Sequence, residues 1–184
     1  MGFSWIQPLD EALLHLGQRV LDSEILARLL TFFTRLGDRG LLWIILAVLL
    51  PLHPKTRRGG LLLAVSLAVT AVLGNLVLKP LVARERPFLA LEGLRMLIPP
   101  PGGFSFPSGH AGSSFAAATA LCLAFGKRGA WAFLPAGVIA VSRVCLGVHY
   151  PSDVVAGALL GLAVTALSAR VLRHWGLRKE RGQE

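Results

Sequence analysis

The sequence has little cysteine and few acidic residues. Only two of its 184 residues are cysteines, Cys122 and Cys145, and both lie inside apolar segments. They form no CxxC motif, so the sequence indicates neither a disulfide framework nor a zinc site. Residues 1–10 lack a basic start and a small-residue cleavage site, so we expect no cleaved signal peptide.

Acidic residues number 10 against 19 lysines and arginines, which gives a formal net charge of +9. Such an excess of positive charge can indicate a nucleic-acid partner. Here, however, the basic residues stand in short clusters between apolar runs, a pattern typical of membrane topology. We therefore expect a lipid bilayer, and no nucleic acid, as a partner of this chain.

Apolar residues make up 54% of the sequence and the mean hydropathy is +0.63. This is too apolar for a soluble domain of this size. The length predicts a single domain over residues 1–184. The predicted fold class is an all-α integral membrane bundle with five transmembrane helices, or six if the N-terminal region also crosses. The sequence gives no indication of an oligomeric state.

The five predicted crossings are apolar segments separated by short polar connections. They are residues 41–52, 61–78, 111–125, 130–148 and 154–172. The first is short, because about 20 residues are needed to cross ~30 Å of hydrocarbon. Residues 1–36 form an amphipathic region, with charged and apolar residues on opposite sides of a helix. This region either lies in the membrane interface or packs against the bundle.

Lysine and arginine clusters predict the orientation. They occur at residues 55–58, at 127–128 and in the tail, residues 173–184. Counting alternate crossings puts all three on one side, which the distribution of positive charge identifies as cytoplasmic. The outer loop, residues 79–107, then lies on the extracytoplasmic face of the cell membrane. Within this loop we expect residues 89–98 to form a short interfacial helix.

Six polar side chains stand at or near the ends of these apolar segments: Lys79, Arg86, His110, Arg143, His149 and Asp153. Charges beside hydrocarbon-length segments are costly, so they indicate a functional site. Three cations suit an oxyanion, one histidine can attack it, and another can protonate what leaves. Taken singly, each has an ordinary explanation: a histidine can cap a helix, and a cation can reach the headgroups. Together they favour phosphoryl transfer.

Three motifs carry a closer resemblance. They are Lys79-x6-Arg86-Pro87, Pro107-Ser108-Gly109-His110 and Ser142-Arg143-x5-His149-x3-Asp153. In this order they resemble the signature of the type 2 phosphatidic acid phosphatase superfamily, which shares its site with vanadium haloperoxidases. The motifs span residues 79–153, and the apolar pattern extends the similarity over roughly residues 24–173.

The residue types suggest a role for each group. We predict that His149 is the nucleophile, that Asp153 accepts the proton of its other ring nitrogen, and that His110 is the general acid. Lys79, Arg86 and Arg143 would bind the phosphate, together with Ser108 and Gly109 at a helix start. Pro87, Pro107 and Ser142 would give structural support. Arg84, Glu85, Glu92 and Arg95 are expected to be ordinary loop charges.

We expect no metal and no other cofactor, because metal-dependent phosphatases need clustered carboxylates and the outer loop offers only Glu85 and Glu92. The resemblance implies the same. It also implies a lipid phosphate substrate, with undecaprenyl diphosphate or phosphatidylglycerophosphate preferred for so short a chain. Two alternatives remain open: a phosphotransferase with an acceptor other than water, and a non-enzymatic binder or transporter of lipid phosphates. The pair Gly157 and Gly161 is expected to serve helix packing within the bundle.

Overall fold

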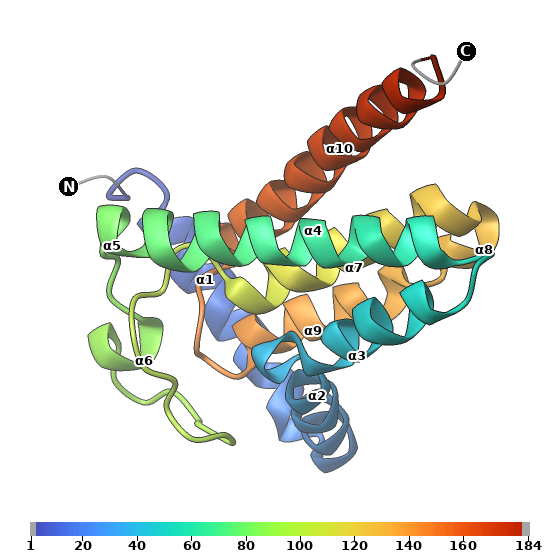
Figure 1. Cartoon of the computed structure of the whole chain (residues 1–184). Coiled ribbons are helices and arrows are strands. Elements are labelled where there is room, and N and C mark those ends of the chain that lie inside the picture. The colour runs from blue at the N-terminus through green and yellow to red at the C-terminus, as the bar shows by residue number, and fades with distance from the viewer. Residues whose placement is uncertain (1–2, 182–184) are drawn as a thin grey trace.

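Helix α7 (Gly109–Phe125) occupies the centre of the bundle (Figure 1). In this computed structural model, which describes residues 3–181, every regular element is a helix. Small side chains allow the close packing around α7, since Ala111, Ala116, Ala117 and Ala120 are fully buried. The predicted all-α bundle is confirmed by this architecture.

Helix α10 (Pro151–Arg181) packs along α7 through its two glycines. A Cβ atom on Gly157 would lie 2.3 Å from the carbonyl oxygen of Ser108, and one on Gly161 would lie 2.3 Å from that of Gly112. No larger residue fits at either position. The glycine pair therefore serves packing within the chain, as predicted, and brings the start of α10 against the start of α7.

The helix after residue 56 is longer than predicted and changes its winding. It runs as α4 (Arg57–Ala71), the π-helical segment η4 (Val72–Leu78) and α5 (Lys79–Val82) without a break. It ends at Ala83, which has a left-handed backbone conformation with φ 48°. Lys79 consequently stands on a helix, one turn from its end, where the sequence analysis had placed it at the start of a loop.

The N-terminal region consists of two helices packed against the bundle. These are α1 (Gln7–Gln18) and α2 (Glu24–Leu36), joined by the 3-10 turn η1 (Arg19–Asp22) and an extended Ser23. Leu14, Leu30 and Thr34 are buried on the inner side. Of the two alternatives left open by the sequence, the structure shows packing against the bundle, although residues such as Phe32 remain exposed on the outer side.

The remaining elements connect these layers. After α2 come η2 (Asp38–Gly40), α3 (Leu41–Leu49) and η3 (Leu50–Leu52). Between α5 and α7 lies α6 (Pro87–Ala90), and between α7 and α10 lie α8 (Lys127–Ala130) and α9 (Phe133–Cys145). The predicted crossing 130–148 is thus divided before α9. The predicted helix 89–98 was wrong: Leu91 is extended and Gly93 has φ 78°, so α6 stops after one turn.

Two helical stretches within the described residues are long and apolar enough to cross a membrane, Arg57–Ala90 and Pro151–His174. The full count of five crossings stays a prediction. Figure 1 shows α5 and α6 at one end of the bundle and α8, with the α3–α4 connection, at the other. The basic clusters 55–58 and 127–128 therefore lie away from α5 and α6. The last three residues of the predicted basic tail, 182–184, lie outside the described residues.

Candidate active site

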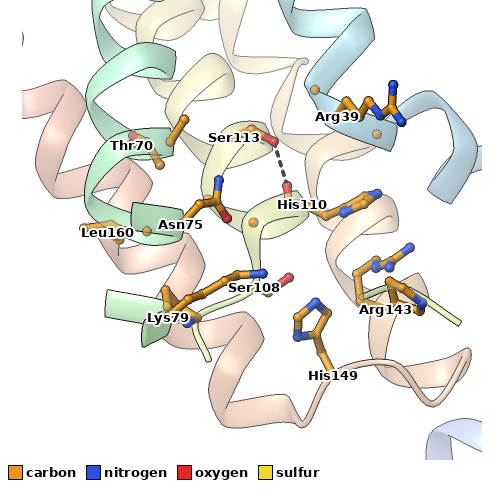
Figure 2. A pocket seen from close by; sticks show the side chains of 18 of the residues that line it. Arg39, Thr70, Asn75, Lys79, Ser108, His110, Ser113, Arg143, His149 and Leu160 are labelled. Atoms are coloured by element: carbon orange, nitrogen blue, oxygen red, sulfur yellow. Dashed lines mark hydrogen bonds between the residues drawn. The ribbon is translucent and has the colours of Figure 1, made fainter. Parts of the chain in front are cut away.

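One cavity of about 270 Å³ opens at the end of the bundle where η4 passes into α5. Eight of the predicted site residues line it: Lys79, Arg86, Pro107, Ser108, Gly109, His110, Arg143 and His149. Figure 2 shows the labelled members of this set arranged around one space. On its other side the cavity is lined by apolar residues, including Leu67 and Ala71 of α4 and Leu160 of α10. The sequence motifs therefore meet in space, and their polar end is continuous with an apolar wall.

The turn between α9 and α10 positions His149. Helix α9 ends just after Arg143, and Gly147 follows in a left-handed conformation with φ 68°. The backbone N–H groups of Val148 and His149 then donate to the carbonyl oxygen of Arg143, at 3.1 and 3.2 Å. Pro151 begins α10, as a proline at the first position of a helix should. This turn brings the imidazole of residue 149 back beside the guanidinium of residue 143.

Asp153 lies in the first turn of α10 and is fully buried. Its Oδ2 accepts from the backbone N–H of Tyr150 at 2.9 Å. Its own carbonyl oxygen accepts from the N–H of Ser108 at 2.9 Å, which joins the second motif to the third. Asp153 thus stands behind His149 and does not line the cavity.

The predicted direct bond between His149 and Asp153 is replaced by a chain of two contacts. Nδ1 of His149 is 3.7 Å from Oδ2 of Asp153, too far for a hydrogen bond. The hydroxyl of Ser105 lies between them, 3.4 Å from Nδ1, and donates to Oδ2 at 2.5 Å. Ser105 is buried and was missed by the sequence analysis. Its only signal was its place three residues before Ser108.

His149 is held in its neutral form. Burial away from water lowers its pKa to about 3, and the positive charges of Arg86 and Arg143 act in the same direction, against the negative charge of Asp153. Nη1 of Arg86 lies 3.2 Å from Nε2. Because a guanidinium can only donate, Nε2 presents its lone pair and Nδ1 carries the proton. The lone pair is directed at Arg86, which lines the same cavity as His149.

The three cations are held in different ways. Arg86 donates from Nε to Gly103 O at 2.8 Å, from Nη2 to Gly102 O at 3.0 Å and from Nη1 to Val148 O at 2.9 Å. It therefore ties the outer loop to the third motif. Arg143 donates from Nη1 to the hydroxyl of Thr34 on α2. Its Nε is buried and has no partner within residues 3–181, which leaves a donor for an anion in the cavity.

Arg84 is not the ordinary loop charge that the sequence analysis expected. It is buried, and its guanidinium contacts Asp153 Oδ1 and Asp10 Oδ2, each at 2.7 Å. It also lies between two aromatic rings, 4.1 Å from the centre of Phe3 and 3.9 Å from that of Tyr150. Ion pairs across 74 and 69 residues leave no local sequence pattern, which explains the error.

The other three loop charges agree with the expectation. Glu85, Glu92 and Arg95 are exposed, and Arg95 pairs with Asp22 at 3.0 Å on the surface. Of the residues predicted to give structural support, Ser142 is buried and donates to Ile139 O at 2.6 Å, and Pro87 begins α6. Ser108 caps α7, its hydroxyl accepting from the N–H of Ala111 at 3.4 Å.

His110 is the second residue of α7, and its Nε2 lies 3.0 Å from Oδ1 of Asp38. Asp38 belongs to η2, and the sequence analysis gave it no role. Within the described part of the chain, no group of three or more His, Cys, Asp or Glu side chains is arranged to hold a metal ion.

The sequence model of the PAP2 superfamily matches residues 59–176, which include every motif residue. The chain belongs to the PAP2 superfamily. This confirms the resemblance to type 2 phosphatidic acid phosphatases. Asp10, Thr34 and Asp38, which support the site, come before the region of this PAP2 member that the superfamily model matches.

Named relatives cover most of this PAP2 member. The undecaprenyl-diphosphatase of Sulfolobus acidocaldarius is 37% identical over 147 residues, 78% of this chain and 69% of that protein. The decaprenylphosphoryl-5-phosphoribose phosphatase of Mycobacterium tuberculosis is 38% identical over 131 residues, 71% and 72% of the two chains.

A solved structure shares the fold. The first transmembrane PAP2 type phosphatidylglycerolphosphate phosphatase from Bacillus subtilis has a TM-score of 0.72 and 28% identity, covering 93% of this chain and 88% of that one. This PAP2 member is accordingly a membrane protein.

Proposed function

We propose that this PAP2 member hydrolyses a phosphomonoester or diphosphate of a membrane lipid through a phosphohistidine intermediate, without a metal ion. Its place among named phosphatases makes it an enzyme of the lipid phosphatase class. The observation that carries the mechanism is the cavity itself, where a neutral imidazole, a second histidine and three cations converge.

The proposed first step is attack on phosphorus. Nε2 of His149 forms a bond to the phosphorus atom, and the bond from phosphorus to the lipid oxygen breaks. His110 gives a proton to the departing oxygen, so the lipid product leaves as a neutral alcohol or as a lipid monophosphate. Lys79, Arg86 and Arg143 stabilise the negative charge that spreads over the phosphoryl oxygens.

The second step hydrolyses the intermediate. Water attacks the phosphorus atom of phosphohistidine and passes a proton to His110, which is now neutral and acts as a base. Inorganic phosphate leaves, and both histidines return to their starting states. Ser105 and Asp153 stabilise the positive charge that forms on the ring of His149 during both steps.

The substrate is proposed to be undecaprenyl diphosphate or phosphatidylglycerophosphate. The apolar wall formed by Leu67, Ala71 and Leu160 would accept the first part of a lipid tail, while the phosphate occupies the polar end. Relatives named for a polyprenyl diphosphate and for phosphatidylglycerolphosphate support both substrates. The site would face the extracytoplasmic side of the cell membrane, with the C-terminus cytoplasmic. A tag at residue 184 that proves accessible only from outside the cell would overturn this orientation.

The deciding experiment measures phosphate release from a panel of lipid monophosphates and diphosphates by purified protein, beside His149→Ala. We expect release by wild type that is lost in the variant and that EDTA leaves unchanged. Binding without release of phosphate would indicate a lipid-phosphate binder or transporter. A phosphorylated acceptor in place of inorganic phosphate would indicate a phosphotransferase. Activity lost in EDTA and restored by Mg²⁺ would overturn the metal-independent mechanism.

A further inference from the structure

The carboxylate of Asp38 is in direct contact with His110. Oδ1 lies 3.0 Å from Nε2, and the imidazole is largely shielded, with 18% of its surface exposed, while Asp38 retains 58%. An ionised carboxylate can only accept a hydrogen bond, so Nε2 must carry a proton in this contact. Nδ1 is thereby left as the ring nitrogen that can face a substrate in the cavity.

The turn that carries Asp38 fits closely against this histidine. Gly37 has no room for a side chain, because a Cβ atom there would lie 2.8 Å from Cδ2 of His110 and 2.7 Å from Cγ2 of Ile139. Arg39 and Gly40 follow in left-handed conformations, with φ of 53° and 69°. These two left-handed residues directly follow Asp38, whose carboxylate contacts His110 while its neighbours Gly37, Arg39 and Gly40 line the cavity.

The charges around His110 are otherwise positive. Arg143 of α9 faces it, and Lys79 of α5, Arg86, Arg39 and the neutral ring of His149 line the same cavity. The other nearby carboxylate, Asp153, is turned toward Arg84 and Ser105. Burial and Arg143 lower the pKa of His110 to about 4, and Asp38 is the charged group that acts against this lowering.

Building on the proposed function, we infer that Asp38 is a positioning residue for the general acid: its carboxylate favours the imidazolium of His110 over the neutral ring and directs Nδ1 toward the leaving oxygen. Asp38 forms no bond to substrate. The proton that moves to the lipid oxygen comes from Nδ1 of His110, and the attacking water returns it in the second step. The Nε2–H contact with Asp38 is kept throughout, so the carboxylate stabilises the imidazolium that starts the cycle.

The test compares pH profiles of phosphate release from undecaprenyl diphosphate and phosphatidylglycerophosphate. In Asp38→Asn we expect the alkaline limb of kcat to move down by about one pH unit, the lower end of the effect of an opposite charge at contact distance. At a fixed pH on this limb, activity would fall roughly tenfold, and it would recover about one pH unit lower. Asp38→Glu, which keeps the charge, should restore the limb. Asp22→Asn, which removes an exposed carboxylate paired with Arg95, is the matched control and should follow wild type.

A second measurement does not depend on turnover. The ¹⁵N signals of His110 in histidine-labelled protein, assigned with His110→Gln, should titrate at lower pH in Asp38→Asn than in wild type. If Asp38→Asn lost activity equally at every pH, and neither the alkaline limb nor the titration of His110 moved, the inference would be overturned. The proposed function would remain intact. Absence of phosphate release by wild type itself would overturn the proposed function, and the inference with it.

Discussion

The two histidines of the site have carboxylate partners in opposite surroundings. The side chains of His149 and Asp153 are 3% and 0% exposed, and Ser105 and Arg84 complete their contacts. His110, which lines the cavity, and Asp38 are 18% and 58% exposed. Burial favours the neutral form of an imidazole, which suits a nucleophile. Burial and Arg143 lower the pKa of His110 as well, to about 4, but contact with the hydrated carboxylate of Asp38 acts against this and favours the charged form that an acid needs.

The largest expected effect separates the two histidines by the substrate's leaving group. His149→Ala should lower phosphate release by a factor on the order of 10⁴ or more, whatever the substrate, because no bond to phosphorus can form. His110→Ala should cost roughly 10²-fold with a lipid alcohol as leaving group. With 4-nitrophenyl phosphate the loss of activity in His110→Ala should be smaller, because nitrophenolate leaves without a proton. Equal losses for both variants on both substrates would contradict the assigned roles.

Next in size is the effect of removing the arginine behind Asp153. Arg84→Met should destabilise the fold by about 3 kcal/mol, because two buried carboxylates lose their cation. Thermal unfolding in detergent measures this, and phosphate release should fall together with stability. Arg95→Met, which removes the cation of an exposed pair, should cost only about 0.5 kcal/mol. If both variants unfold at the same temperature, Arg84 has no stabilising role.

A smaller effect is expected at the hydroxyl between His149 and Asp153. Ser105→Ala should lower kcat roughly tenfold and leave KM nearly unchanged, because the link between Nδ1 and the carboxylate is lost while the phosphate contacts remain. Thr119→Ala, which removes a hydroxyl bonded within α7, is the control and should keep wild-type kinetics. An unchanged kcat in Ser105→Ala would mean that His149 reaches Asp153 directly during turnover.

The smallest effect concerns pH and stability. The pKa of His149 is about 3 in the folded protein against an ordinary value of 6.5, so the unfolded chain binds the extra proton first. The stability that comes from the neutral ring is present above pH 6.5 and is lost as the pH falls toward 3. Thermal midpoints measured between pH 7 and pH 4.5 should therefore fall more steeply in wild type than in His149→Gln. Parallel curves would show that His149 titrates normally.

The sequence predicted the residues that line the cavity better than it predicted the buried ion pairs that hold them in place. Lys79, His110, Arg143 and His149 were found because fixed spacings place them at the ends of apolar segments, and the structure brings them to one cavity. Arg84 resembled any other loop cation, because its partner Asp10 lies on a different helix. Pairings of this kind depend on how α1 and α2 pack, and a one-dimensional pattern does not record packing.

The secondary structure shows the same division. Apolar runs predicted the central helices, but their ends moved by several residues wherever the next element was polar, as at Arg57 and Arg181. The irregular chain between α6 and α7 was misread in part as a helix. Gly93 and the carbonyl groups that Arg86 holds decide its path, and neither effect produces periodicity.

The π-helical segment η4 has a consequence for how this enzyme can be altered. Each residue of a regular helix turns by about 100°, and a π segment holds one residue more than the regular winding would. Deleting a single residue between Val72 and Leu78 would remove this extra residue and leave the following helix nearly in place, whereas regular winding of all seven residues would rotate everything after it by about 100°. In the second case the ammonium of Lys79 would leave its place at the cavity, although no motif residue had been changed.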